Sequence, residues 1–307
     1  TSIAIGNGIK AIGKEAFLYC EGLNGVYITD IAAWCNIKFG SNPLSYANNL
    51  YLNEELVTDL VIPNGVTAIG RSAFSGCKSL TTATIGNNVA KIGNGAFYKC
   101  TSLTSITIPD SVTEICDSAF SGCEGLTNVT IPNSVTEIGR SAFSDCKSLT
   151  NATIGNNVAT IGDYAFQNCT NLTSITIPDS VTGVGEGAFK GCEGLTKVTI
   201  PDSVTKIGNY AFYNCWYLTE ITIPDSITEI GSFTFYYCSR LKSITIPHSV
   251  TKIGDSAFYS CRGMKNITIS KNLIAIGEES FYDCEELTSV TIPDSITTIG
   301  NYAFFNC

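Results

Sequence analysis

The chain has 307 residues, of which 44% are hydrophobic and 15% charged, and its formal net charge is -9 at pH 7. This composition is too apolar for a disordered chain, and the 18 Lys and Arg residues are scattered singly, which argues against a nucleic-acid-binding patch. The sequence contains no run of about 18 apolar residues, so no membrane-spanning helix is predicted. No signal peptide opens the chain, and because both ends lie inside a repeated pattern, we interpret it as part of a longer protein.

Cysteines recur every 23 residues from Cys77 to Cys307, and Cys20 belongs to the same series. A fixed period of this length indicates a solenoid with one coil per repeat, because a propeller blade needs about 40 residues or more. We therefore predict one solenoid domain over residues 1–307. Its parts are a partial coil (1–22), an irregular enlarged coil (23–56), ten regular coils (57–286) and a second partial coil (287–307).

Each coil, counted from its leading Leu, has apolar or small residues at positions 1, 4, 6, 10, 13, 17, 18 and 21. Alternation around position 4 predicts a short strand with one buried face. The phrase IPDSV predicts a turn, and VTEIG a second extended piece closed by Gly. Asp or Asn at position 15 then predicts the N-cap of a short helix over SAFSGC and its equivalents. Examples are Asp117, Asp163 and Asn209.

The full phrase L-x-x-I-x-I-P-x-x-V-x-x-I-G-x-x-A-F-x-x-C resembles the BspA-like, or TpLRR-class, leucine-rich repeat. The resemblance covers the whole chain except roughly residues 23–56. It implies an α/β fold: a curved, right-handed leucine-rich repeat solenoid with a parallel sheet of short strands and short helical turns. It also implies a cell-surface or secreted protein of bacterial or protist type, implicated in adhesion and protein binding.

The irregular segment from residue 23 to residue 56 breaks the period. We expect a strand over Val26–Thr29, a short helix around Asp30–Phe39, a loop through Pro43 and a hairpin from Leu50 that turns at Asn53–Glu55. The segment is rich in aromatic residues, which either pack against neighbouring coils or line a ligand pocket. These residues are Tyr27, Trp34, Tyr46 and Tyr51.

The cysteines raise the question of disulfides, because strands stack about 4.8 Å apart and disulfides join Cα atoms at about 5.5 Å. However, side chains at one repeated position run parallel, and a disulfide needs side chains directed at each other. We therefore predict a buried ladder of reduced thiols. Cys35 and Cys116 lie outside the ladder and are expected to be more exposed.

Catalytic chemistry has little support in the sequence. His248 is the only histidine and stands at a turn position that is mostly Asp or Asn in other coils. There is no Gly-x-Ser-x-Gly motif and no Cys-x-x-Cys zinc motif. We expect no enzyme activity, no catalytic residues, no metal and no cofactor. The Thr repeated at position 5 suggests ice binding as a rival function, but charged residues such as Lys197 and Glu220 interrupt the neighbouring position 3.

A cluster of aromatic residues at positions 16, 19, 20 and just after the Cys is expected to face outward in four neighbouring coils. Tyr and Trp are typical of binding surfaces, although stacking that merely covers the core is the alternative. The candidate binding residues are Tyr210, Tyr213, Trp216, Tyr217, Phe233, Tyr236, Tyr237 and Tyr259, with Tyr282 beside them.

We predict a non-enzymatic binding or adhesion module that recognises a protein or glycan partner at a cell surface over an extended surface. The alternative is a purely structural spacer in a larger surface protein. The aromatic cluster is the favoured contact surface, with Trp216, Tyr217, Tyr236 and Tyr237 foremost. The strand face, with Lys197 and Glu220, is its competitor.

Overall fold

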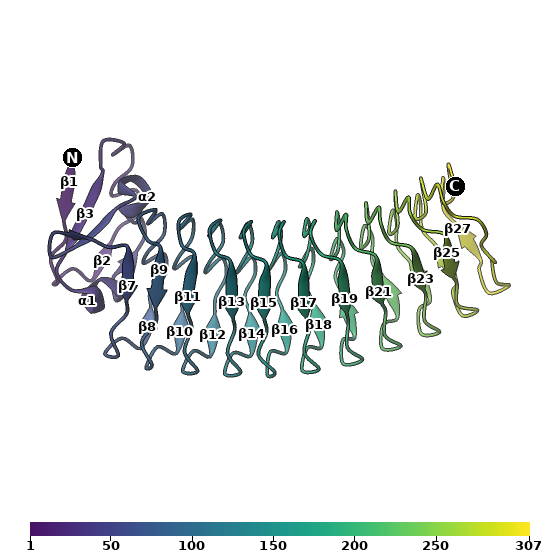
Figure 1. Cartoon of the computed structure of the whole chain (residues 1–307), viewed down its shortest axis with the longest axis horizontal. Coiled ribbons are helices and arrows are strands. Elements are labelled where there is room, and N and C mark those ends of the chain that lie inside the picture. Colours follow the sequence, from purple (N-terminus) through teal and green to yellow (C-terminus); the bar gives the residue numbers. More distant parts are fainter.

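The structure, a computed structural model, describes all 307 residues as an elongated stack of coils (Figure 1). Each regular coil contains two short strands. A tight turn joins them along the lower edge in Figure 1, and a longer series of turns along the upper edge leads to the next coil. The predicted solenoid of 23-residue coils with parallel strands is confirmed.

The first strands of the coils are β1 (Ser2–Ala4), β3 (Gly25–Ile28), β5 (Leu50–Leu52), β7 (Asp59–Val61), β9 (Thr82–Thr84), β11 (Ser105–Thr107), β13 (Asn128–Thr130), β15 (Asn151–Thr153), β17 (Ser174–Thr176), β19 (Lys197–Thr199), β21 (Glu220–Thr222), β23 (Ser243–Thr245) and β25 (Asn266–Thr268). The second strands are β2 (Ala11–Ile12), β4 (Lys38–Phe39), β8 (Ala68–Ile69), β10 (Lys91–Ile92), β12 (Glu114–Ile115), β14 (Glu137–Ile138), β16 (Thr160–Ile161), β18 (Gly183–Val184), β20 (Lys206–Ile207), β22 (Glu229–Ile230), β24 (Lys252–Ile253), β26 (Ala275–Ile276) and β27 (Thr298–Ile299).

Strands of neighbouring regular coils pair in parallel with a constant offset of one repeat, as in Val198 opposite Ile221 and Ile138 opposite Ile161. The first strands form four sheets, in the orders β1-β3-β5, β11-β9-β7, β13-β15-β17-β19-β21 and β23-β25, and β6 (Glu55–Leu56) extends the sheet of β1 beyond β5. The second strands form three sheets, β2-β4, β20-β18-β16-β14-β12-β10-β8 and β22-β24-β26-β27. In-register pairing places identical positions of successive coils directly beside one another.

The core is one continuous cluster of 87 buried hydrophobic residues between the two strand faces. Phe at position 18 forms its spine: the rings stack from Phe74 to Phe304, with centroids 5.2–5.7 Å apart and interplanar angles of 17° or less. No coil can bury its inward side chains alone, so stability comes from the contacts between coils.

The prediction of a short helix over residues 118–123, and over the same positions of the other coils, is wrong. This segment forms consecutive tight turns. Ser118 and Gly122 have φ values of 55° and 75°, in the left-handed region that interrupts a right-handed helix. Alternate amides donate to the next coil instead, as Phe120 does to the Ala142 carbonyl at 2.8 Å. The Asp117 carboxylate likewise accepts from the Arg140 amide of the next coil at 2.9 Å, so it caps no helix of its own.

The irregular segment contains most of the expected elements. Strand β3 pairs in parallel with β5, and β5 forms an antiparallel hairpin with β6 (Glu55–Leu56), turning through Asn53 and Glu54 at positive φ. Helix α1 (Ile31–Cys35) is capped by Asp30 but is shorter than predicted, because Lys38–Phe39 leaves to pair as β4. Helix α2 (Leu44–Ala47) follows Pro43, where only a loop was expected.

The aromatic residues of this segment pack structurally. Trp34 is buried, and its Nε1 donates to the Ala73 carbonyl at 2.7 Å, which ties the segment to the first regular coil. The rings of Tyr27 and Tyr51 stack with centroids 4.4 Å apart. Packing against neighbouring coils therefore accounts for these three rings.

All fourteen cysteines are free. Two expectations about their exposure are wrong. Cys35 and Cys116 are buried rather than exposed, because the next coil covers each of them: the Gly70 amide donates to the Cys35 carbonyl, and Gly139 lies against the Cys116 backbone. Cys20 and Cys307, by contrast, are exposed although they belong to the ladder, since each lies in a terminal coil that has a neighbour on one side only.

Candidate binding surfaces

The candidate aromatic residues fall into two groups, and the larger one forms stacked columns on the outer turns. Position 19 of consecutive coils places Tyr213, Tyr236, Tyr259, Tyr282 and Phe305 in one continuous column. Adjacent centroids lie 4.6–4.8 Å apart, and the rings are tilted by at most 18°. Each ring therefore uses its faces against its neighbours and presents its edge and any hydroxyl outward.

A second, shorter column flanks the first. Tyr210 and Phe233, both at position 16, stack at 4.8 Å, and each also contacts the position-19 ring of its own coil. Tyr237 meets Tyr236 edge-on at 4.7 Å. We call all these rings together the aromatic columns. The structure thus brings together six of the eight predicted residues.

A lysine covers the start of the main column. Lys190 occupies position 19 of the preceding coil, and its Nζ lies 4.8 Å from the Tyr213 ring centroid and 5.5 Å from that of Tyr210. Such cation–π contacts stabilise partly desolvated rings. Sequence reasoning missed this residue, although its position in the repeat identifies it as the next member of the column.

The tyrosine hydroxyls of the main column are unpaired donors. Among the tyrosines only Tyr164 uses its hydroxyl in a hydrogen bond within the chain, to Glu186. Burial is the main cause that raises the pKa of Tyr213, Tyr236 and Tyr259, and the neighbouring tyrosine hydroxyls raise it further. These hydroxyls therefore stay protonated well into the alkaline range and can donate hydrogen bonds to a partner.

Trp216 and Tyr217 form the second group, apart from the columns. Trp216 is 51% exposed and Tyr217 is 44% exposed, and neither ring stacks on another ring. Arg240 of the next coil lies over the Tyr217 ring, 4.2 Å from its centroid. We call these three residues the Trp216 patch. Arg240 was absent from the predicted set. The one signal for it in the sequence is that it stands at the same repeat position as Tyr217, one coil later.

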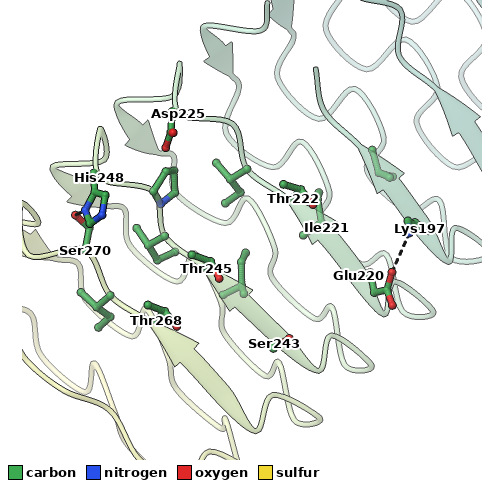
Figure 2. Close-up of a pocket in the computed structure, with 16 residues that line it drawn as sticks. Lys197, Glu220, Ile221, Thr222, Asp225, Ser243, Thr245, His248, Thr268 and Ser270 are labelled. Carbon is green, nitrogen blue, oxygen red and sulfur yellow. Dashed lines mark hydrogen bonds and ion pairs between the residues drawn. The ribbon is translucent and has the colours of Figure 1, made fainter. Parts of the chain in front are cut away.

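The competing surface is a hollow of about 460 Å³ on the face of the first strands, shown in Figure 2. Thr222, Thr245 and Thr268 line its floor from three successive coils, and His248 lies on its rim beside Ser270. The Lys197–Glu220 ion pair, 3.1 Å long, lies at the opposite end and is solvent-exposed. Exposed ion pairs contribute little stability, and the hollow contains no aromatic side chain other than that of His248.

Comparisons with known proteins agree with this architecture. The sequence matches the BspA type Leucine rich repeat region (6 copies) over residues 44–173, 90–219, 159–274 and 251–307. No curated protein matches the chain. None of its helices combines the length and apolar character that crossing a membrane requires.

Several solved structures are similar. A leucine-rich repeat protein from Bacteroides ovatus ATCC 8483 shares 28% identity with a TM-score of 0.77, over 100% of this chain and 84% of that one. The T. pallidum Leucine Rich Repeat protein shares 27% identity with a TM-score of 0.51, over 60% of this chain and 77% of that one. A leucine-rich repeat protein from Eubacterium ventriosum ATCC 27560, at 21% identity and a TM-score of 0.54, covers 99% of this chain and 90% of its own, and shares the fold. The chain belongs to the BspA-type leucine-rich repeat family.

Proposed function

We propose that this chain is the binding module of a cell-surface or secreted protein, and that it recognises a protein partner through the Trp216 patch and the adjoining edges of the aromatic columns. Leucine-rich repeat families generally supply binding scaffolds rather than catalysts. The mechanism is one of area and shape, in which a rigid array presents many contacts at once.

The observation that carries the proposal is the exposure of Trp216 and Tyr217 beside Arg240. Trp, Tyr and Arg are enriched among the interface residues whose truncation weakens binding by about 2 kcal/mol or more. The unpaired tyrosine hydroxyls nearby add hydrogen-bond donors without requiring the rings to reorder. A protein partner is favoured over a glycan because stacking on sugars needs free ring faces. Neighbouring rings cover the faces inside the columns, and Arg240 lies over the Tyr217 ring, which leaves Trp216 as the one unstacked and uncovered ring of the patch.

A structural spacer is the second candidate, and the column stacking favours it. Rings that lie face to face from one coil to the next stabilise the stack whether or not a partner exists. Tyr236 contacts Tyr213, Tyr237 and Tyr259, so its replacement would disturb the fold as well as any binding. Substitutions in the Trp216 patch distinguish the two proposed functions, because Trp216 and Tyr217 are exposed and stack on no other ring.

The test compares two double variants of the chain by biolayer interferometry against immobilised candidate proteins and by flow cytometry on whole cells. Trp216→Ala with Tyr217→Ala should weaken binding by roughly tenfold or more, since a hot-spot truncation often costs about 2 kcal/mol, and should leave Tm unchanged. The matched control, Lys197→Ala with Glu220→Ala, should bind normally. The reverse pattern would place binding on the strand face, and a parent chain that binds nothing would favour the spacer.

A further inference from the structure

One coil, Leu218–Arg240, is joined to each of its neighbours by only one of the two strand ladders. Toward the preceding coil, β19 pairs with β21, but β20 and β22 belong to different sheets. Toward the following coil, β22 pairs with β24, but β21 and β23 belong to different sheets. One further interruption lies between the first strands β11 and β13. The two coils that meet there each lack a ladder on one side only, whereas the Leu218–Arg240 coil lacks one on both sides.

Backbone hydrogen bonds show the first interruption directly. The position-14 amides of the flanking coils donate across the coil boundary, Gly208 to the Val184 carbonyl and Gly254 to the Ile230 carbonyl, each at 2.8 Å. The Gly231 amide, at the same position, makes no such bond to Ile207. A Cβ added at Gly254 would meet the preceding coil's backbone at 2.6 Å, whereas one at Gly231 would meet the Asn209 side chain first.

A serine with a buried hydroxyl at the second boundary also lacks the bond that its equivalents make. Serines at position 9 donate their hydroxyls to the preceding coil, as Ser226 does to the Val204 carbonyl at 2.5 Å and Ser203 to the Val181 carbonyl at 2.7 Å. Ser249 has the same position, but its buried hydroxyl has no partner. The hollow of Figure 2 extends over this boundary and over the boundaries on either side of it, with lining residues from β19 to β25.

The sequence offers a cause. Position 17 is Ala in the neighbouring coils, as at Ala211 and Ala257, but Thr234 occupies it in the Leu218–Arg240 coil. Thr234 is buried, and its Oγ1 donates to the Gly231 carbonyl at 2.7 Å within its own coil. Interiors are close-packed, so added side-chain volume at such a site displaces the backbone around it.

The aromatic columns span both interrupted boundaries. Tyr213 and Tyr236 stack at 4.8 Å across the first boundary, and Tyr236 and Tyr259 stack at 4.6 Å across the second. Aromatic pairs of this geometry stabilise a structure beyond the area they bury. We infer that the Leu218–Arg240 coil is a hinge in the solenoid, and that the columns clamp it where its strand ladders are interrupted.

This inference does not rest on the proposed function, because it concerns the free chain. Hydrogen exchange followed by mass spectrometry on the whole protein tests it. Peptides that contain Gly231 and β21 should exchange about tenfold faster than their equivalents in the coil of residues 149–171, which is the change that about 1.4 kcal/mol of local stability produces. Equal protection in the two coils would overturn the hinge.

Two variants test the clamp and the cause separately. Tyr236→Ala should speed exchange in the Leu218–Arg240 coil and its neighbours, while Gln167→Ala, at the same repeat position in an uninterrupted part of the stack, should not. Thr234→Ala should slow exchange at Gly231 toward the rate at Gly208. If Tyr236→Ala leaves exchange rates unchanged, or raises them around residue 236 no more than Gln167→Ala raises them around residue 167, the columns are not a clamp.

Discussion

The thiol of Cys146 donates a hydrogen bond to the main-chain carbonyl of Phe120 in the preceding coil, at 3.3 Å. A carbonyl has two lone pairs, and the Cys123 amide of the same coil already uses one of them at 3.1 Å. The relationship recurs at every ladder cysteine from Cys100 to Cys307. Cysteine therefore fits this position as a small apolar side chain with one weak donor.

Thiol labelling should distinguish two classes of cysteine. Of the fourteen free cysteines, only Cys20 and Cys307 are exposed. A thiol reagent such as Ellman's should titrate about two groups quickly in the native protein and all fourteen after denaturation, because reaction needs an accessible thiolate. Disulfides between adjacent coils, detected as missing thiols after denaturation, would contradict the ladder.

Alkaline pH should destabilise the fold. Burial raises the pKa of the Cys192 thiol from 9.0 to about 12, and that of Cys35 to about 12. Below pH 9 both the folded and the unfolded states hold these protons, so these thiols do not make the free energy of unfolding depend on pH there. Between pH 9 and pH 12 only the unfolded state releases them, so the free energy of unfolding should fall, by about 1.4 kcal/mol per pH unit for each such thiol.

The measurement is urea unfolding at pH values from 7 to 11. Cys192→Ala provides the matched comparison, since it removes one buried thiol and should make the decline shallower. A free energy of unfolding that stays constant up to pH 11 would show that the thiols are not protonated and buried as described.

Phe143 should be essential to its own coil. It is fully buried and stacks on Phe120 at 5.2 Å and on Phe166 at 5.4 Å. Phe143→Ala should lower the free energy of unfolding by about 3–5 kcal/mol, as is usual for a buried Phe. Phe305→Ala, at a ring that is half exposed, should lower it far less. Denaturant melts measure both, and a loss below about 1 kcal/mol for Phe143→Ala would indicate a surface position.

Much of the fold could be predicted because one pattern is repeated many times. Leu172, Val181, Phe189 and Cys192 each stand at a position that stays apolar or small throughout, and all four are fully buried. Recurrence separates inward from outward positions even where one coil alone is ambiguous. The hairpin turn at Asn53 and Glu54 was equally predictable, since it depends on local turn chemistry.

Interactions between coils could not be predicted in the same way. Asp163 looks like a helix cap when one coil is considered alone, but its carboxylate accepts from the Glu186 amide of the next coil at 2.8 Å. The stacking of Tyr213 on Tyr236 follows from their shared position. The clamp role depends in addition on the interrupted ladders of the Leu218–Arg240 coil, and these are bonds between coils that the repeat pattern does not mark. The burial of Cys116 was missed for a similar reason, because it comes from the coil that follows.

The proposed binding surface is tested most directly by hydrogen exchange of the chain with and without its protein partner. If the partner docks on the Trp216 patch and the adjoining column edges, binding slows exchange in residues 213–217 and 236–240 and leaves β23 and β25 unchanged. Protection confined to the strands that line the hollow, with residues 213–217 unaffected, would contradict this surface and place recognition on the strand face.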